Sequence, residues 1–406
     1  MSTNILLIDS SIWKNKGGGG IVLGMVNVLQ DLFEEPEITV HCNEPELCDQ
    51  HLNWDVNFKK CYPVYPEKIA ELTTVVKESG ILLGETILNR ISFLKYTDNF
   101  ADYVDADIVL GAGGGYIGGY NRGTPISLFR LWFASQLGKP VILGPNTVEP
   151  FGYDWLQKVS IPLLKSVDHI MSREQYTTDY LDSLSFGNRT SSVPDAAFMM
   201  YNDSSIDGQE ILNNESSESG PYAGVTVRDW HFNRTENPDK RRQEYLESVA
   251  DTIDYLNEEY GYHVLIAQQV HRDLELSYTV SGMAETDDVS VMEGHYTPTE
   301  MVSTYSELKL LVGTRLHSVL MAFVGGTPAV DISYGVKGHG IMSSLGLDEY
   351  VIDISDITFS QLSAMVDDVV INLSRMEKEI ENKLSKKRQT TKSEWGRILN
   401  VHVDNH

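Results

Sequence analysis

The stretch Leu310-Leu311-Val312-Gly313-Thr314-Arg315-Leu316-His317-Ser318 is the main indication of the fold. It begins with a short apolar run, has a glycine at 313, and is then predicted to continue as a helix. An apolar run of this length, bounded by a turn residue, is typical of a buried strand. Further short apolar runs occur at residues 5–8, 38–40, 107–110, 141–143, 222–227, 263–267 and 329–332, and helical segments separate most of them. Short strands that alternate with helices predict a parallel α/β sheet.

The alternation occurs in two halves of the chain. Residues 202–220 are rich in Ser, Asn, Glu and Gly, which predicts a linker or an exposed loop between the halves. We therefore predict two Rossmann-like α/β domains facing a cleft, at residues 1–205 and 221–370, followed by a helical tail at 371–406. Residues 55–102 are expected to be mostly helical. In such folds, ligands bind beyond the carboxyl ends of the strands.

The chain of 406 residues is strongly acidic, with 58 Asp and Glu, 32 Lys and Arg, and a net charge of −26. This charge repels phosphate backbones, so we expect no nucleic-acid partner. Two explanations stay open: a halophile's salt-rich cytoplasm with an acidic proteome, or an acidic protein of an ordinary cytoplasm. Three cysteines, no apolar run of roughly 20 residues and no signal-peptide pattern indicate a cytoplasmic location.

The C-terminal tail has the opposite charge balance. Residues 375–397 carry eight Lys or Arg and four Asp or Glu. Such a surplus could bring the protein to the inner face of an anionic membrane as a peripheral contact. A solvated basic helix is the alternative.

Arg315 and His317 lie at the start of the helix that follows residues 308–312. Helix N-termini favour anions, and arginine offers a planar fork for a carboxylate or a phosphate. Histidine can donate a proton near neutral pH. The pair therefore predicts an anion site with catalytic capacity, the alternative being a structural arginine and a core histidine.

Further cations follow neighbouring strands. Arg228 ends the strand Gly224-Val225-Thr226-Val227-Arg228, and Lys337 lies in the loop after residues 329–332. Either could contact an acidic ligand; an internal carboxylate for Arg228 and a solvated lysine at 337 are the alternatives. His271-Arg272-Asp273 follows the strand at 263–267 and could line the same cleft.

The first half offers Arg173 and two glycine-rich segments. Arg173 could reach the cleft, although Ser172 and Gln175 also fit a helix capping box that would explain this segment structurally. Gly17, in the run 17–20, and Gly113 and Gly114, after the strand at 107–110, could let the backbone approach an acceptor. Tight turns would explain these glycines equally well.

Taken in chain order, these pieces resemble the polysaccharide pyruvyl transferase family. The matching segments are Asn15-Lys16-Gly17, residues 107–115, Gly144-Pro145-Asn146, Ser172-Arg173-Glu174, residues 194–198, residues 224–228, Gly313-Thr314-Arg315-Leu316-His317 and Tyr334-x-x-Lys337. Two positions depart from the family pattern. Gly18 stands where the family has Asp, and Pro-Asn-Thr follows Gly144.

The resemblance implies a fold similar to GT-B glycosyltransferases, phosphoenolpyruvate as donor and a sugar diol of a glycan or polysaccharide precursor as acceptor. The product would be a pyruvate ketal, with phosphate released. By position, Arg228, Arg315 and His317 match residues that hold the donor, and Lys337 matches one required for activity. Arg173 would join the phosphoenolpyruvate site, and Gly17, Gly113 and Gly114 would lie on the acceptor side. No metal and no cofactor besides the co-substrate phosphoenolpyruvate is expected.

Several alternatives stay open at this point. A GT-B glycosyltransferase could use Arg315 and Lys337 to grip the diphosphate of a nucleotide sugar. A carbohydrate-binding subunit without activity is a third reading. The acceptor sugar could be lipid-linked, nucleotide-linked or part of a finished polymer, and His317 could be the general acid or a hydrogen-bond donor to phosphate.

Overall fold

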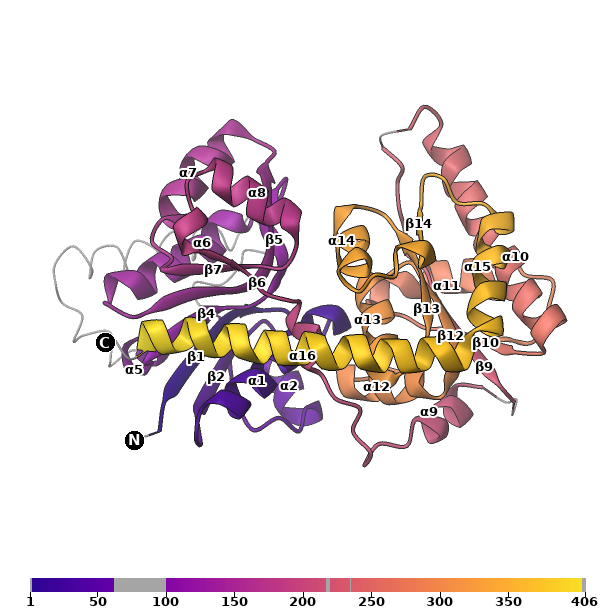
Figure 1. Ribbon diagram of the computed structural model, residues 1–406, viewed down its shortest axis with the longest axis horizontal. Coiled ribbons are helices and arrows are strands. Elements are labelled where there is room, and N and C mark those ends of the chain that lie inside the picture. The colour runs from indigo at the N-terminus through magenta and orange to yellow at the C-terminus, as the bar shows by residue number, and fades with distance from the viewer. Residues whose placement is uncertain (1, 62–99, 217–219, 234, 404–406) are drawn as a thin grey trace. The chain divides into compact units, whose positions relative to one another are not determined.

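The computed structural model describes residues 2–61, 100–216, 220–233 and 235–403. The chain forms two compact units. Unit 1 contains Met1–Trp13, Ile21–Met199 and Gln389–His406, and unit 2 contains Lys14–Gly20 and Met200–Arg388. Each unit has its own parallel sheet with helices packed against it (Figure 1). The segments 14–20 and 389–406 thus group with units that chain order alone does not suggest.

The sheet of unit 1 has the strand order β3-β2-β1-β4-β6-β7-β8, with β5 paired to β6 beside this path. Its strands are β1 (Asn4–Ser10), β2 (Glu37–Cys42), β3 (Asn57–Lys60), β4 (Ile108–Gly111), β5 (Gly114–Gly119), β6 (Val141–Phe151), β7 (His169–Ser172) and β8 (Thr190–Ser192). Its helices are α1 (Lys16–Leu32), α2 (Pro45–His51), α5 (Ala101–Asp105), α6 (Thr124–Gln136), α7 (Asp154–Leu164) and α8 (Gln175–Ser183). In Figure 1, α1 and α2 lie on one side of the sheet, and α6, α7 and α8 lie on the other.

The predicted strands of unit 1 contribute to its apolar core. Leu6 of β1, Val109 of β4 and Leu143 of β6 are buried in one apolar cluster with Leu131 of α6. The strands predicted near residues 5, 38, 107 and 141 are therefore confirmed.

The two glycine-rich segments of the first half of the chain form a strand and the start of a helix. Gly114–Gly119 is strand β5, and a Cβ on Gly118 would lie 1.9 Å from the Glu149 carbonyl oxygen of β6. The strand therefore needs glycine to approach its neighbour, a requirement that composition does not reveal. Residues 17–20 lie in the first turns of α1, which begins at Lys16.

The sheet of unit 2 has the strand order β11-β10-β9-β12-β13-β14, and all its pairings are parallel. Its strands are β9 (Tyr222–Thr226), β10 (His263–Ile266), β11 (Val289–Val291), β12 (Leu308–Gly313), β13 (Ala329–Ser333) and β14 (Val351–Asp353). Its helices are α9 (Gly208–Glu215), α10 (Pro238–Tyr260), α11 (Leu274–Ser281), α12 (Pro298–Ser306), α13 (Leu316–Gly325), α14 (Val336–Ser344) and α15 (Phe359–Ile371). The predicted strands of the second half are confirmed.

Parallel strands place their carboxyl ends at one edge of the sheet. In unit 2, the segments after β9, β10, β12 and β13 therefore meet at this edge. Arg228 follows β9, Asp273 lies beyond β10, Arg315 follows β12, and Tyr334 follows β13. Helix α13 packs on β12 and β13 and directs its first turn to the same edge.

Two other segments differ from their predictions in part. Residues 202–220 are not linker throughout, because α9 forms within them, capped by the Asp207 side chain. Most of the segment 55–102 lies outside the described residues; at its described ends are strand β3 and helix α5.

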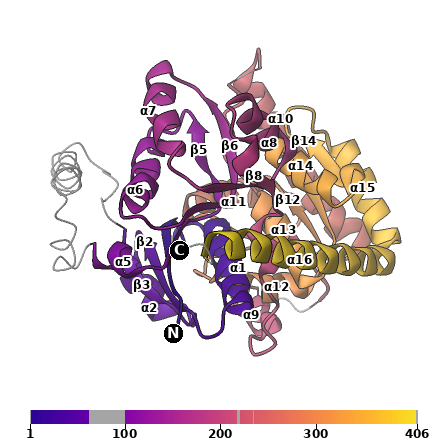
Figure 2. The ribbon, with the colours of Figure 1, turned by 60° about the vertical axis from the view of Figure 1, so that its left-hand side comes forward.

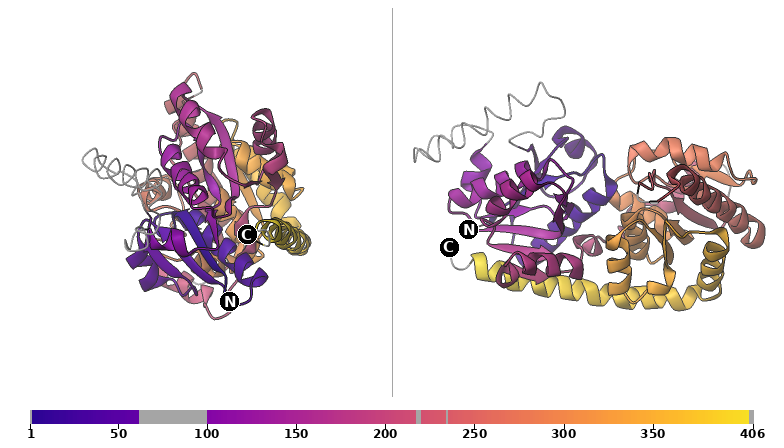
Figure 3. Two further views of the ribbon diagram at one scale, coloured as in Figure 1. Left: turned by 90° about the vertical axis from the view of Figure 1, so that its left-hand side faces the viewer. Right: turned by 90° about the horizontal axis from the view of Figure 1, so that it is seen from above.

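The tail is one continuous helix, α16 (Leu373–Val403), as predicted (Figures 2 and 3). It is not solvated on all sides, since Trp395 is fully buried. Several of its basic side chains have acidic partners: Lys383 pairs with Glu379, Lys392 with Asp31 and Arg397 with Glu394. Contact with a membrane through this helix stays a prediction. Within the described part of the chain, none of the helices combines the length and apolar character that crossing a bilayer requires.

Candidate functional site

Arg315 and Asp273 form a buried ion pair at the carboxyl edge of the unit 2 sheet. Arg315 immediately precedes α13, and Asp273 ends the short helix η4 (His271–Asp273) after β10. The guanidinium donates from Nε to Asp273 Oδ2 at 2.9 Å and from Nη2 to Oδ1. Because two hydrogen bonds align both groups, the pair holds the guanidinium in one orientation. It occupies two of the five N–H donors of arginine.

Hydroxyl groups connect the segments that follow β9 and β12. The Tyr245 hydroxyl of α10 accepts a hydrogen bond from the backbone N–H of Arg228 at 3.1 Å and donates to Thr314 Oγ1 at 3.0 Å. Burial raises the pKa of Tyr245 to about 12, so this hydroxyl stays neutral. Tyr245 thereby ties together the two segments that carry Arg228 and Arg315.

Arg228 is held by aromatic faces. Its guanidinium carbon lies 3.8 Å from the ring centre of Tyr334 and 5.3 Å from that of Trp230. Among the residues that the structure describes, its buried Nε has no hydrogen-bond partner and no carboxylate pairs with the guanidinium. Burial lowers the pKa of Arg228, and the positive charges of Arg315 and Arg272 act in the same direction. Ring faces leave the in-plane N–H groups of an arginine available to an anion.

His317 lies in the first turn of α13 and packs against the start of α1. A Cβ on Gly17 would lie 2.8 Å from His317 Nδ1, so only glycine permits this approach without a shift. The resemblance to the family implied an acceptor-side position for Gly17, together with Gly113 and Gly114. The structure instead groups it with unit 2, against a residue expected to hold the donor.

Lys16, the first residue of α1, also lies at the carboxyl edge of the unit 2 sheet. Its backbone N–H donates to the Gln269 carbonyl at 3.2 Å, and Asn15 forms an antiparallel bridge with Val270. The Lys16 side chain is only 2% exposed, and its Nζ has no hydrogen-bond partner among the described residues. Burial lowers its pKa to about 8, while the charge of Asp273 opposes this shift. An unpartnered buried ammonium is energetically costly, so the protein alone does not stabilise the charge of Lys16.

The segment after β13 supplies Lys337 and Asp331. Lys337 is the second residue of α14 and is half-buried. Asp331 lies in β13, is 1% exposed, and burial raises its pKa to about 7. A Cβ on Gly338 would lie 2.5 Å from Asp331 Oδ2, so this carboxyl lies beneath the first turn of α14. Of the predicted donor residues, Arg228, Arg315, His317 and Lys337 are thus brought to one edge of one unit.

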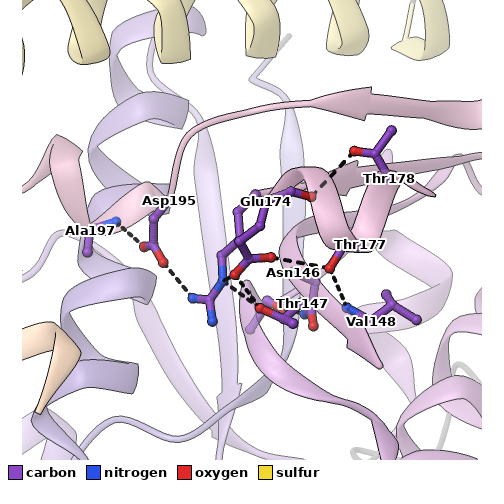
Figure 4. Close-up of polar contacts among 10 residues, drawn as sticks. Asn146, Thr147, Val148, Glu174, Thr177, Thr178, Asp195 and Ala197 are labelled. Atoms are coloured by element: carbon purple, nitrogen blue, oxygen red, sulfur yellow. Dashed lines mark hydrogen bonds and ion pairs between the residues drawn. The ribbon is translucent and has the colours of Figure 1, made fainter. Parts of the chain in front are cut away.

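Arg173 is placed differently, in a buried network of unit 1. Figure 4 shows the side chains of this network, with Thr147, Glu174 and Asp195 labelled. Its Nε donates to Thr147 Oγ1 at 2.9 Å and to Glu174 Oε1 at 2.8 Å, and its Nη1 donates to Asp195 Oδ2 at 2.5 Å. Asp195 also accepts from the Ala197 N–H at 2.9 Å. Burial alone would lower the pKa of Arg173, but both carboxylates raise it. This geometry favours the structural alternative for Arg173.

The capping box predicted for Ser172 and Gln175 is wrong. Helix α8 begins at Gln175 with Glu174 as its N-cap residue, and no side chain caps it. The Ser172 hydroxyl instead forms a hydrogen bond with the Thr178 hydroxyl at 2.7 Å. Glu174 is drawn into the Arg173 network, where its Oε2 accepts from the Thr177 hydroxyl at 3.2 Å.

Gly113 and Gly114 have packing roles in unit 1. A Cβ on Gly113 would lie 2.8 Å from both Ile21 Cγ2 and the Pro145 carbonyl oxygen. Gly114 has φ of +143°, which side chains disfavour. Both glycines are therefore required by local geometry, and an acceptor role for them stays a prediction.

The described residues contain no group of three His, Cys, Asp or Glu side chains that could hold a metal ion. At the carboxyl edge of the unit 2 sheet, where parallel α/β sheets bind ligands, Arg315 pairs with Asp273. The charge of Asp273 also acts on Lys16 and Arg228.

The family model of the polysaccharide pyruvyl transferases matches residues 15–335. The chain belongs to this family. The amylovoran biosynthesis protein AmsJ of Erwinia amylovora is 24% identical over 410 residues, which cover 95% of this chain and 96% of AmsJ. The matched range includes Lys16, Arg228, Arg315 and His317 of this pyruvyl transferase family member, whereas Lys337 lies two residues beyond it.

Solved structures show that this family member has a GT-B-like fold. The UDP-GlcNAc 2-epimerase of Neisseria meningitidis matches with a TM-score of 0.62 and 11% identity, covering 100% of both chains. Alr3699/HepE of Anabaena matches with a TM-score of 0.60 and 10% identity, covering 98% of this chain and 99% of that one. At such identities the likeness concerns the fold alone. The predicted fold class is confirmed.

For three contributors to the site of this family member, the sequence indicated only part of their role. Lys16 was quoted only as part of a motif, because its contacts with residues 269 and 270 are far away in sequence. Asp273 was noted without its partner, Arg315, which lies 42 residues further on. Tyr334 was read only as a motif position, although Tyr334-x-x-Lys337 was a signal that pointed to it.

Proposed function

We propose that this protein transfers the pyruvyl group of phosphoenolpyruvate to a sugar diol of a polysaccharide precursor, forming a pyruvate ketal and releasing phosphate. The observation that carries this proposal is Arg228, stacked on Tyr334 without a carboxylate partner among the described residues, beside Arg315. Two neighbouring arginines with one shared carboxylate suit a small ligand with several negative charges. Phosphoenolpyruvate carries a carboxylate and a phosphate on three carbons.

The reaction requires several bond changes. A proton adds to the methylene carbon of phosphoenolpyruvate, which makes C2 electrophilic. One sugar hydroxyl then forms a C–O bond to C2 and loses its proton. The bond between C2 and the bridging phosphate oxygen then breaks, and phosphate leaves with the electron pair. The second hydroxyl forms the other C–O bond to C2, loses its proton and closes the ketal.

In this scheme, Arg228, Arg315 and Lys337 neutralise the donor and the departing phosphate. His317 donates either the proton to carbon or a hydrogen bond to phosphate, and both roles fit its position in the first turn of α13. None of the bond changes is a redox step, so the proposal includes no cofactor besides phosphoenolpyruvate. The description of the family and the name of AmsJ as a biosynthesis protein favour a polysaccharide precursor as acceptor.

The first test is a thermal-shift titration of the full chain in low and high KCl. A ligand that binds the folded state raises the melting temperature by mass action. We expect a shift with phosphoenolpyruvate that Arg315→Ala abolishes. A shift with UDP- or GDP-sugars alone would overturn the proposal and indicate a glycosyltransferase.

The second test is turnover. Phosphoenolpyruvate is incubated with a panel of lipid-linked, nucleotide-linked and polymeric glycans, and both phosphate release and the product mass are measured. Acceptor-dependent phosphate release together with a pyruvate ketal on the glycan supports the proposal. Phosphate release without a modified glycan would contradict it.

A further inference from the structure

The ammonium group of Lys16 is buried without a hydrogen bond to any described residue that would stabilise its charge. The side chain is 2% exposed, and Nζ has no hydrogen-bond partner among the described residues. It is also the first residue of the 17-residue helix α1, where the helix dipole disfavours a positive charge. Burial and the dipole therefore both oppose an ammonium at this position.

The surrounding charges do not compensate for this cost. Asp273 is the acidic group that acts on Lys16, and its two carboxylate oxygens already accept hydrogen bonds from Arg315. Arg228 lies close enough for the charges of Arg315 and Asp273 to act on it as well. Lys16, Arg228 and Arg315 thus share one carboxylate, which leaves this part of unit 2 with an excess of positive charge.

The segment that carries Lys16 is bound to the carboxyl edge of the unit 2 sheet, where Arg228 and Arg315 lie. Its backbone N–H binds the Gln269 carbonyl after β10, and the next residue, Gly17, packs on the His317 ring. Lys16 therefore belongs to the same compact unit as Arg228, Arg315, His317 and Lys337.

We propose that Lys16 is a further substrate-binding residue, whose ammonium contacts the phosphate group of the donor. This inference rests on the proposed function, because it assigns one group of phosphoenolpyruvate to one side chain. Arginine offers a fork that matches a carboxylate, whereas the compact charge of lysine suits a phosphate. Lys16 then stabilises the phosphate as it leaves, next to His317.

The test uses the two halves of the donor as separate probes, inorganic phosphate and pyruvate, together with phosphoenolpyruvate itself. Calorimetric titrations compare the wild-type chain with Lys16→Met, which keeps the length and removes the charge, and Lys16→Arg, which keeps the charge. Lys309→Met, at an exposed position of β12, is the matched control.

We expect Lys16→Met to weaken binding of phosphate and phosphoenolpyruvate at least about tenfold and to leave pyruvate binding unchanged. Lys16→Arg should restore much of the loss, and Lys309→Met should bind like the wild type. Equal binding by Lys16→Met and the wild type would overturn the role of Lys16 while the proposed function stands. If the wild type binds phosphate but not phosphoenolpyruvate, the proposed function fails, and the inference about this donor falls with it.

Discussion

Asp273 holds the guanidinium of Arg315 through two hydrogen bonds across 42 residues of sequence. The carboxylate comes from the segment after β10, and the arginine comes from the segment after β12. Because β9 lies between these two strands in the sheet, the pair spans the edge directly above β9. Arg228 emerges from that same strand end. The ion pair therefore lies beside Arg228, and both of its charges act on that arginine.

The first prediction concerns this pair. Asp273→Ala leaves the buried Arg315 charge without its partner, which we expect to destabilise the protein by about 3–5 kcal/mol. Urea unfolding of the full chain measures this loss. Glu275→Ala, two residues away at an exposed position, should change stability by less than about 0.5 kcal/mol. Similar unfolding midpoints for both variants would contradict a structural role for the pair.

The second prediction concerns the aromatic support of Arg228. Tyr334→Leu removes the ring 3.8 Å from the guanidinium carbon, so the arginine loses its fixed orientation. We expect phosphoenolpyruvate affinity to fall by about 1–2 kcal/mol, or roughly five- to thirty-fold. Tyr334→Phe retains the ring face and should bind like the wild type. If both variants lose affinity equally, the hydroxyl and not the ring face is responsible.

The third prediction concerns the contact between α1 and His317. Gly17→Ala places a methyl group 2.8 Å from His317 Nδ1, so the imidazole or the helix start must shift. Displacements near 1 Å at a reacting group can lower rates roughly a hundredfold, and we expect at least a tenfold loss in kcat/KM. Gly220→Ala, where a Cβ meets nothing within 4 Å, is the control. Unchanged turnover in Gly17→Ala would show that this close contact is not needed to position His317.

Much of the fold could be predicted because strand and helix periodicities are local. The βα order of both halves and the position of Arg315 at a strand end follow from short apolar runs and one glycine. Strand β5 could not be predicted, because its glycines are required by the backbone of β6, a contact that composition does not encode. The partner of Arg315 and the placement of Lys16 depend on register between distant segments, which a single sequence does not specify.

The division into units shows the same limit. Residues 14–20 precede most of unit 1 in the chain, and therefore the sequence suggested an acceptor-side role for Gly17. The bridge between Asn15 and Val270 assigns this segment to unit 2. For Arg173, the sequence left a ligand contact and a structural role open. The buried carboxylates of Glu174 and Asp195 favour the structural role.

The fourth prediction concerns the pH dependence that Asp331 introduces. Burial raises its pKa from 3.8 to about 7 in the folded protein. Between these values the folded state holds the extra proton, so this residue makes stability fall as pH rises from about 4 to 7. The full difference corresponds to roughly 4 kcal/mol. Asp331→Asn should therefore be more stable than the wild type above pH 7 and similar to it below pH 4, as measured by urea unfolding across pH. A constant difference across this range would show that Asp331 does not titrate as described.

The fifth prediction separates the effect of Lys16 on the stability of the protein from its role in ligand binding. The unfolded chain protonates Lys16 up to its ordinary pKa of 10.5, whereas burial lowers the pKa to about 8 in the folded protein. Between these values the unfolded state holds more protons, so this residue makes stability rise with pH. Below pH 8, the charged side chain costs roughly 3 kcal/mol. Lys16→Met should therefore unfold at higher urea concentration than the wild type at neutral pH, and this advantage should vanish above about pH 10.5. A lysine kept only for structure would make Lys16→Met less stable. A variant that is more stable yet binds phosphate less well shows that the buried charge serves the ligand.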